Sequence, residues 1–464
     1  MPNKIKYGVC LPIMLAVPLF LWLMPLSWLA IEGTTVVQQR MIAIFAFAAL
    51  SWVFEVIPNW VTSVLVIVIM LFTVSSQGLA FLVSPDVGQL VNYKAIIASF
   101  ADPVIMLFLG GFVLAIVAGK YGIDAVIARN LMKVFGTRPK FVLLGFLLTV
   151  STFSMFMSDT ATSAMFFAFL APVLKSLPDS EKGRIGLTLA IPFAALTGGM
   201  GTPIGTPPNA IAVGALANAS IQIHFGQWML HMIPYVIIMI LIIWGILQLF
   251  YPCQVKELKF EIPVKNTKPT VRTYIAWITF FVTIILWVTE SWTGLNSNVV
   301  ALVPVAIYAL TGIFTKEDLK SIDWAVLWLV AGGFALGTGL EQTGLADLMI
   351  SAIPFDSMNI VRIALIAGFV CYGLSNFISN SATAALIIPI MMVVCKVVGG
   401  QTEMIPYIAI CASLAMTLPI STPSNAIATS TGMVTTKQMA QVGLIIGIIG
   451  FVLGYFWLTV IFPF

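Results

Sequence analysis

Four short polar clusters interrupt apolar stretches of this chain, and they hold the side chains best suited to bind small ions. Each cluster combines Ser or Thr with Asn, Asp or Pro. Where a helix restarts after such a break, its first N–H groups are unpaired and partly positive, which suits a small anion. The opposite helix ends expose carbonyl oxygens, which can coordinate Na⁺ together with hydroxyl and amide oxygens. The clusters are residues 158–160, 205–209, 379–381 and 421–425.

Fixed positive charge is missing from the sequence around these clusters. Residues 185–227, 363–395 and 405–436 contain no Asp, Glu, Lys or Arg. Helix N-termini each contribute about 0.3 to 1 kcal/mol to anion binding at a surface, which is small beside the cost of dehydrating a dianion. Co-bound cations supply the missing stabilisation, so the pattern predicts coupling to a cation.

The composition indicates what kind of molecule carries these clusters. Of 464 residues, 60% are hydrophobic and 9% are charged, whereas soluble globular domains are about 25% charged. This excludes a cytosolic enzyme, a nucleic-acid binder and a secreted disulfide scaffold. We expect an all-α integral membrane protein that crosses the lipid bilayer several times and is a pore, a carrier or a membrane enzyme.

Apolar segments of roughly 20 residues are long enough to span a bilayer and predict about eleven transmembrane helices. Two further apolar stretches, 141–175 and 363–395, are each broken near the middle by a polar cluster, and we interpret them as re-entrant helical hairpins. The expected spans are 8–30, 40–57, 60–82, 103–119, 186–218, 228–250, 273–290, 297–313, 324–341, 405–435 and 441–462.

The second half of the chain repeats the first at an offset of about 220 residues. LGGFVLA at 109–115 returns as AGGFALG at 331–337, and FMSDTATSAM at 156–165 returns as FISNSATAAL at 377–386. GTPPNAIA at 205–212 likewise returns as STPSNAIA at 421–428. Chance similarity between apolar stretches would share Leu and Val, but hardly Ser, Asn, Thr and Pro in register. We therefore infer an internal duplication.

Positive charge predicts how the two halves are oriented. The first hairpin is flanked by several Lys and Arg residues from Arg129 to Arg184, whereas the second has only Arg362 and Lys396. By the positive-inside rule the hairpins enter from opposite faces, as an inverted-topology repeat requires. With Lys4 inside and eleven crossings, the N-terminus and the basic linker 252–272 are cytoplasmic and the C-terminus is external. We expect the cell membrane as the location.

Other interpretations make weaker use of the same residues. Ser, Thr, Pro and Gly often pack or kink transmembrane helices, but four breaks paired by repeat are harder to explain in this way. A channel would need charge rings or a carbonyl-lined path, and the breaks carry almost no charge. No nucleophile–base pair or metal-ligand cluster indicates an enzyme. His224 and His231 have no acidic partner nearby in sequence, which favours interfacial anchoring over proton relay.

At the four clusters the sequence resembles the divalent anion:sodium symporters, carriers of dicarboxylates, tricarboxylates or sulfate. That family has a Ser-Asn-Thr motif at the tip of each of two re-entrant hairpins and a Thr-Pro or Ser-Pro-rich unwound helix in each repeat. All four features have counterparts here, and the resemblance covers nearly the whole chain. It implies an eleven-helix protomer, a homodimer joined through a scaffold, and elevator movement of a transport domain.

The resemblance also implies binding residues. One sodium site would use Ser154, Ser158, Asp159 and the backbone near Gly205, and a second would use Ser375, Asn380 and the backbone near Ser421. The substrate-binding candidates are Ser158, Asp159, Thr160, Thr206, Pro207, Ser379, Asn380, Ser381, Thr422 and Pro423.

Asp159 departs from the family motif, which has Asn at this position. An ionised carboxylate here would bind a cation more tightly but repel an approaching anion. Asp159 is therefore either ionised and strengthens its sodium site, or protonated during the cycle and couples transport to H⁺. A purely structural alternative is that Asp159 caps the helix that begins near Ala161.

We therefore interpret the chain as a secondary active transporter of a small di- or tricarboxylate, such as succinate, malate, fumarate or tartrate, driven by Na⁺. A Na⁺-independent or H⁺-coupled exchanger of the same fold and a sulfate carrier remain alternatives, and no nucleic-acid partner is expected. The expected division is a scaffold of residues 1–119 and 228–330, and a transport domain of 120–227, with an unwound helix near 202–209, and 331–464, with another near 420–425.

Overall fold

The apolar stretches of the chain fold into helices, because a backbone inside lipid must satisfy its hydrogen bonds within its own segment. The computed structural model describes residues 6–29, 33–83, 87–258, 269–352, 360–397 and 402–464. Within these ranges the only β-type pairing is an isolated bridge between Ser75 and Val91. The expected all-α class is confirmed. Lys4 and residues 259–268 of the linker expected at 252–272 lie outside the described residues.

The first half of the chain runs from an N-terminal helix to the long helix α12. Its order is the same as that of the second half: helices that precede a hairpin, the hairpin itself, a broken helix and a final long helix. The bounds are α2 (Leu11–Leu23), α3 (Val36–Phe54), α4 (Asn59–Thr73), α5 (Tyr93–Ala98), α6 (Pro103–Tyr121), α7 (Ile123–Lys133), α8 (Pro139–Ser154), α9 (Asp159–Ser176), α10 (Gly183–Gly199), α11 (Pro207–Asn218) and α12 (Phe225–Phe250).

The second half repeats this order with shorter segments at its start. The bounds are α13 (Val271–Val288), α14 (Glu290–Thr293), α15 (Ser297–Val300), α16 (Leu302–Leu310), α17 (Lys316–Leu319), α18 (Trp324–Gln342), α19 (Leu345–Ala352), α20 (Ile360–Ser375), α21 (Asn380–Val397), α22 (Met404–Ser413), α23 (Pro423–Ser430) and α24 (Thr436–Phe456).

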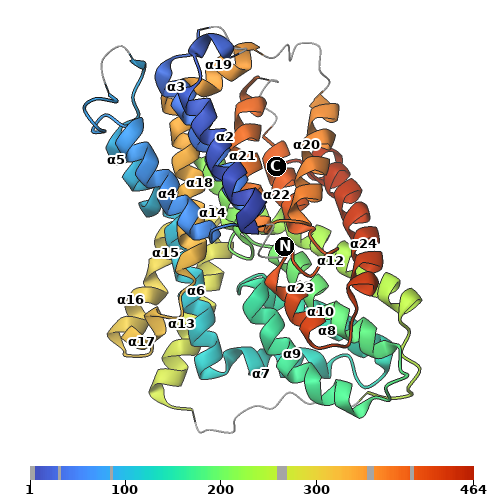
Figure 1. Ribbon diagram of the computed structural model, residues 1–464. Coiled ribbons are helices and arrows are strands. Elements are labelled where there is room, and N and C mark those ends of the chain that lie inside the picture. Colours follow the sequence, from blue (N-terminus) through green and yellow to red (C-terminus); the bar gives the residue numbers. More distant parts are fainter. Residues whose placement is uncertain (1–5, 30–32, 84–86, 259–268, 353–359, 398–401) are drawn as a thin grey trace.

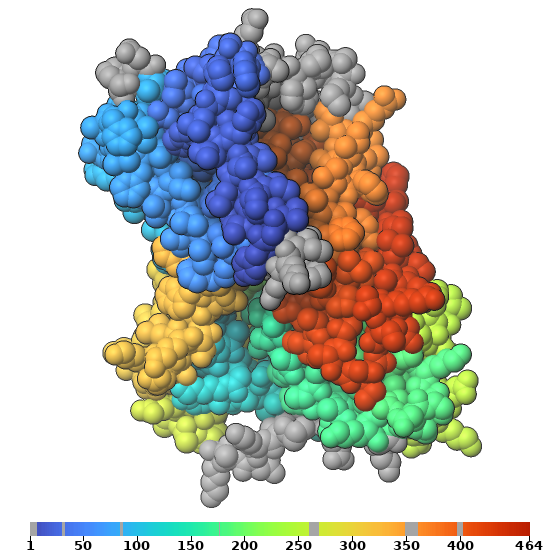
Figure 2. Space-filling model, in the orientation of Figure 1, coloured from blue at the N-terminus to red at the C-terminus, as the bar shows by residue number. Residues whose placement is uncertain are grey.

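Six helical segments of the described residues are long and apolar enough to cross a membrane, namely Val36–Phe54, Tyr93–Tyr121, Phe225–Phe250, Val271–Val288, Trp324–Gln342 and Thr436–Ile461. Shorter apolar helices overlap four of the other expected spans, and these helices are Tyr7–Leu23, Asn59–Thr73, Ser297–Leu310 and Met404–Ser413. The total of about eleven crossings therefore stays a prediction. Large apolar side chains such as Leu23, Leu249 and Ile278 are exposed on the surface, one face of which is seen in Figure 2. Such exposure is expected where lipid is the solvent.

Two helical hairpins occupy the stretches that the sequence marks as broken. The stretch expected at 141–175 forms α8 and α9, and the stretch at 363–395 forms α20 and α21. In Figure 1 the first hairpin lies in the lower half of the molecule and the second in the upper half. Their polar tips lie at mid-height, where the two hairpins meet.

Two further segments are helices interrupted in the middle. The stretch expected at 186–218 is α10 and α11, separated at 200–206, and the stretch at 405–435 is α22 and α23, separated at 414–422. Both second helices begin at a Pro, Pro207 and Pro423, which is favourable at the first helical position because that N–H has no partner in the helix.

Glycine pairs allow close contact between helices of the two halves. A Cβ atom at Gly110 of α6 would lie 2.3 Å from the carbonyl oxygen of Ala301, and one at Gly332 of α18 would lie 2.4 Å from the Cβ of Ser63. A larger residue at either position would push these backbones apart. The repeated GG motif therefore has the same packing role in both halves.

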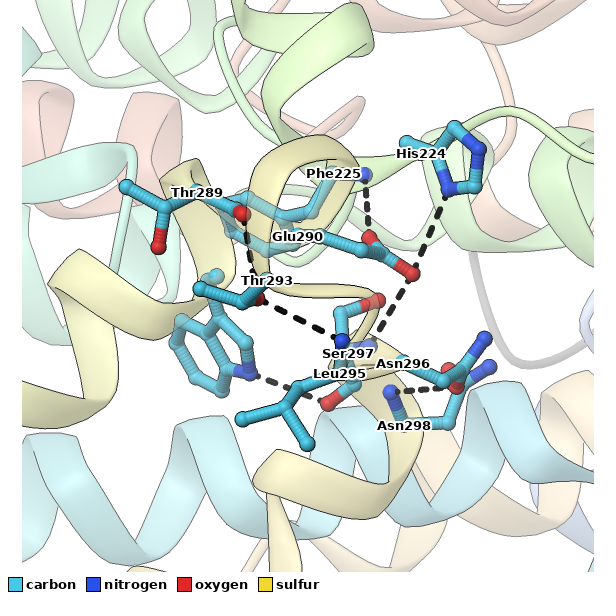
Figure 3. A network of polar contacts seen from close by, with 10 residues as sticks. His224, Phe225, Thr289, Glu290, Thr293, Leu295, Asn296, Ser297 and Asn298 are labelled. Carbon is cyan, nitrogen blue, oxygen red and sulfur yellow. Dashed lines mark hydrogen bonds and ion pairs between the residues drawn. The ribbon is translucent and has the colours of Figure 1, made fainter.

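A buried glutamate of α14 joins the starts of α12, which is distant in sequence, and of the neighbouring α15 (Figure 3). Glu290, 4% exposed, accepts hydrogen bonds from Phe225 N at 2.9 Å and from Ser297 N at 3.1 Å. Its Oε1 also lies 3.4 Å from His224 Nδ1. His224 has no acidic partner nearby in sequence, but the fold brings Glu290 close to it from a distant part of the chain.

Candidate functional site

All four polar clusters line one cavity of about 200 Å³. The helices α9, α11, α21 and α23 each present their first residue to it: Asp159, Pro207, Asn380 and Pro423. Four helix N-termini, two from each half of the chain, therefore converge on the same space. Their unpaired N–H groups and partial positive charges favour an anion there.

The residues proposed from sequence for substrate binding all lie around this cavity. The structure leaves none of them elsewhere, although their clusters are spread over more than half of the chain. They are Ser158, Asp159, Thr160, Thr206, Pro207, Ser379, Asn380, Ser381, Thr422 and Pro423.

Hydroxyl groups cap three of the four helix N-termini. Ser158 Oγ accepts a hydrogen bond from Ala161 N, Ser379 Oγ from Ala382 N and Thr422 Oγ1 from Asn425 N, each at 3.3 Å. A hydroxyl that accepts from the helix keeps its proton to donate elsewhere. The caps can therefore offer O–H donors to an anion in the cavity.

Asp159 lies where the resemblance places a sodium ligand. Its Oδ1 accepts a hydrogen bond from Ser154 Oγ at 2.7 Å. It also lies against a tight backbone crossing, since a Cβ at Gly199 would be 2.7 Å from Asp159 Oδ1 and 3.0 Å from the Gly205 carbonyl oxygen. Carboxylate, hydroxyl and carbonyl oxygens are thus close together, as a hard cation requires.

The alternative that Asp159 caps its helix is wrong, because another residue makes the capping hydrogen bond. Ser158, and not Asp159, accepts from Ala161 N. The Asp159 carboxylate instead accepts a hydrogen bond from Ser154 Oγ.

The second half builds a matching group around Asn380. Ser375 Oγ is 3.0 Å from Asn380 Oδ1 and also donates to the carbonyl of Ala412. Ser421 Oγ donates to the carbonyl of Ala415 at 3.0 Å. Ser154 and Ser375 lie behind the cavity wall, each five residues before the side chain that it contacts.

Two asparagines absent from the predicted site hold the broken helices in shape. Asn209 Nδ2 donates to the carbonyls of Gly199 at 3.0 Å and Thr202 at 2.8 Å. Asn425 Nδ2 donates to the carbonyls of Ala415 and Leu418, both at 3.0 Å. The signal for them was present, because both Asn residues recur in register in the repeated NAIA sequence.

The ionisable side chains that line the cavity are acidic. Asp159 and Asp323 both line it, and none of its described lining residues is Lys, Arg or His. Asp323 is not among the site residues expected from the sequence. It directly precedes the apolar helix α18, where Asp is a common N-cap, and its carboxylate accepts a hydrogen bond from Val326 N at 3.2 Å. Phe108 and Phe112 form part of the remaining wall.

These features can hold an anion and a cation side by side. Hydroxyls and helix N-termini line the cavity, and the pairs Ser154–Asp159 and Ser375–Asn380 place hydroxyl, carboxylate and amide oxygens beside it. Within the described ranges, no group of three or more His, Cys, Asp or Glu residues could hold a metal ion in the manner of a catalytic centre.

Comparisons with known proteins identify similar transporters. Residues 49–410 match a family profile described as citrate transporter. The chain is 31% identical over 445 residues to an uncharacterized transporter of Haemophilus influenzae, which covers 90% of this chain and 91% of that protein. It is 28% identical over 457 residues to the sodium-dependent dicarboxylate transporter SdcS of Staphylococcus saprophyticus, with 89% and 83% covered.

A solved structure has a similar fold. The YdaH transporter of Alcanivorax borkumensis aligns with a TM-score of 0.52 at 13% sequence identity, over 79% of this chain and 87% of that one. At this identity the similarity concerns the fold alone.

Proposed function

The chain belongs to the citrate transporter family and is a membrane transporter of carboxylates rather than an enzyme, and on this premise we propose that it carries a small di- or tricarboxylate together with Na⁺. The substrate class is that of succinate, malate, fumarate and tartrate. The sodium-dependent dicarboxylate transporters among the relatives support this choice.

One observation carries the proposal. Helix N-termini and hydroxyl groups that favour an anion line the cavity, but its ionisable side chains are acidic. A dicarboxylate that enters it meets Asp159 and Asp323 and no described basic group. Two like charges about 4 Å apart repel by about 4 kcal/mol at an effective dielectric constant of 20. A co-transported cation removes this repulsion and adds attraction.

Two groups of oxygens are the proposed sodium ligands. The first comprises Ser154, Ser158, Asp159 and the backbone near Gly205. The second comprises Ser375, Asn380 and the backbone near Ser421. The hydrogen-bonded pairs Ser154–Asp159 and Ser375–Asn380 support the assignment, because each pair brings oxygens together beside the cavity.

Transport requires that the site reaches both faces of the membrane in turn. We assign residues 120–227 and 331–464 to a mobile domain and residues 1–119 and 228–330 to a scaffold, with elevator movement and a homodimeric assembly. The N-terminus is cytoplasmic and the C-terminus external in this proposal. The approach of the two hairpins from opposite ends of the molecule supports an inverted repeat (Figure 1).

Asp159 favours H⁺-coupled transport as a second candidate. Its carboxylate has the Ser154 hydroxyl as its hydrogen-bond donor and no described cation beside it. A proton can neutralise such a group as well as Na⁺ can. Exchange without Na⁺ and sulfate transport use the same cavity and are outcomes of the same experiment.

The test is uptake of labelled succinate by the purified protein in proteoliposomes. We expect uptake to follow an inward Na⁺ gradient and to be indifferent to a pH gradient at constant Na⁺. Uptake that follows the pH gradient would establish the H⁺-coupled alternative. Uptake that needs unlabelled succinate inside, with no ion gradient, would establish exchange. Uptake of labelled sulfate that malate and fumarate do not inhibit would establish a sulfate carrier.

A further inference from the structure

A side chain of α4 contacts the tip of the second hairpin. Asn59, the first residue of α4, donates a hydrogen bond from Nδ2 to Ser379 Oγ at 3.1 Å, across 320 positions of sequence. Ser379 lines the anion cavity, whereas Asn59 is half-buried behind it. This contact joins the proposed scaffold to a proposed substrate-binding residue.

The contact determines where the Ser379 hydroxyl can donate. Ser379 Oγ accepts from Asn59 Nδ2 and also from Ala382 N at 3.3 Å. A hydroxyl has two acceptor sites and one proton. With both acceptor sites engaged behind the cavity, the proton is left to point into it, where a carboxylate would accept it.

Asn59 has its own support. Its carbonyl accepts hydrogen bonds from Trp52 Nε1 and Ser63 Oγ, both at 3.3 Å, and Trp52 is fully buried. Its Oδ1 atom is buried without a hydrogen-bond partner in the described part of the chain. A buried unpaired oxygen is unfavourable, so the oxygen does not hold this amide in place. The hydrogen bond from Nδ2 to Ser379 is the side-chain contact that accounts for its position.

Helix α4 in the first half and helix α15 in the second half begin with the same kind of contact. Trp52 Nε1 donates to the Asn59 carbonyl, and Trp287 Nε1 donates to the Ser297 carbonyl at 3.0 Å. Asn59 begins α4 and Ser297 begins α15. Ser297 is therefore the counterpart of Asn59 in the second half.

The counterpart does not make the equivalent contact. Ser297 lines a second cavity, of about 580 Å³, together with its neighbours Asn296 and Asn298. Among the described contacts no hydrogen bond joins it to Ser158, the tip residue that corresponds to Ser379. A described hydrogen bond thus joins Asn59 to one hairpin tip, and none joins its counterpart Ser297 to the other.

We propose that Asn59 is a positioning residue for anion binding, which orients the Ser379 hydroxyl towards the substrate. It does so only in the arrangement seen here, in which the cavity extends to Asp323. We call the membrane face nearer to Asp323 the Asp323 side. The inference rests on the proposed function. Movement of the hairpins relative to α4 breaks the contact, so Asn59 supports anion binding from one side of the membrane. That side is the cytoplasmic one in the proposed orientation.

The test compares succinate transport from the two sides in vesicles of defined orientation at saturating Na⁺. For Asn59→Ala we expect KM on the Asp323 side to rise about threefold to tenfold, the value of one neutral hydrogen bond. The maximal rate should change by less than twofold. KM measured from the opposite side should not rise.

Two further variants complete the test. Asn59→Asp keeps the shape of the side chain but cannot donate a hydrogen bond, so it should raise KM on the Asp323 side at least as much as Asn59→Ala does. If Asn59→Ala does not fold, Asn59→Asp provides the test. Ser297→Ala, the matched control, should leave that KM unchanged. Equal increases on both sides, or none, would overturn the assignment. Absence of succinate transport in the wild type would refute the proposed function itself, and the inference with it.

Discussion

At the scale of single residues, the two proposed ion sites differ in the identity of one side chain. Asp159 and Asn380 occupy corresponding positions, and each contacts a Ser five residues earlier. The first is a carboxylate and the second an amide, so the halves share geometry but not charge. The Asp159 group should therefore bind a cation more strongly than the Asn380 group does.

The change Asp159→Asn tests this difference. It keeps the size of the side chain and removes its charge, so we expect the Na⁺ concentration for half-maximal uptake to rise about tenfold, equivalent to about 1.4 kcal/mol. The reverse change, Asn380→Asp, should lower that concentration but raise KM for the anion, since it adds a negative charge to the cavity wall. Sodium titrations of succinate uptake would measure both. An unaltered sodium requirement in Asp159→Asn contradicts the assignment.

The residues of the cavity could be predicted to different extents. Motif similarity between the halves identified the substrate candidates, because polar residues that recur in register within apolar segments are rare. Asn59 and Asp323 carry no such signal. Asn59 reaches Ser379 only because α4 is folded against α18, and no local pattern encodes a contact across 320 positions.

At the scale of elements, the broken helices depend on their asparagine clamps. Each clamp satisfies two carbonyls that the interruption leaves without a helical partner. The first break also needs Gly at 199 and 205, because a Cβ at Gly205 would lie 2.3 Å from the Gly199 carbonyl oxygen. The breaks are thus built features that hold polar backbone beside the cavity.

Asn425→Ala should destabilise the protein and reduce uptake. Loss of two hydrogen bonds to buried carbonyls corresponds to about 2 to 3 kcal/mol, and Asn209→Ala should have a similar effect. Thermal unfolding in detergent and succinate uptake are the measurements. Asn130→Ala, at an exposed position on α7, is the control and should behave as the wild type. A clamp variant with control-like stability would refute this role.

The element boundaries followed closely from composition. The stretches expected at 141–175 and 363–395 correspond to hairpins at 139–176 and 360–397. Polar triplets mark their tips, and a Ser or Thr beside a Pro marks the restart of each broken helix. The number of membrane crossings is less accessible, because several helices are shorter than a full span and their depth depends on neighbouring helices.

At the scale of the whole molecule, Glu290 connects segments that the proposed domain division separates. It accepts from the first residue of α12 and the first residue of α15 while staying almost fully buried (Figure 3). A carboxylate between two helix N-termini is stabilised by their dipoles. No sequence pattern indicated this contact, since Glu290 precedes an ordinary polar loop.

Removal of this carboxylate should weaken the whole fold. Glu290→Ala leaves two buried N–H groups unpaired, and hydrogen bonds to charged groups contribute about 1.5 to 3 kcal/mol each. We expect a clear fall in unfolding temperature, with a smaller fall for Glu290→Gln, which keeps one acceptor oxygen. Glu257→Ala, at an exposed position, serves as the reference. A fall no larger than in that reference would show that Glu290 is dispensable.

The empty volume beside Ser297 has a pharmacological consequence. It is larger than the anion cavity, with about 580 Å³ against about 200 Å³, and it is lined by different residues. Its lining includes residues of both the proposed scaffold and the proposed mobile domain, so a compound bound there should hinder the proposed movement without competing for the carboxylate. Such an inhibitor should lower the maximal rate of uptake at every substrate concentration.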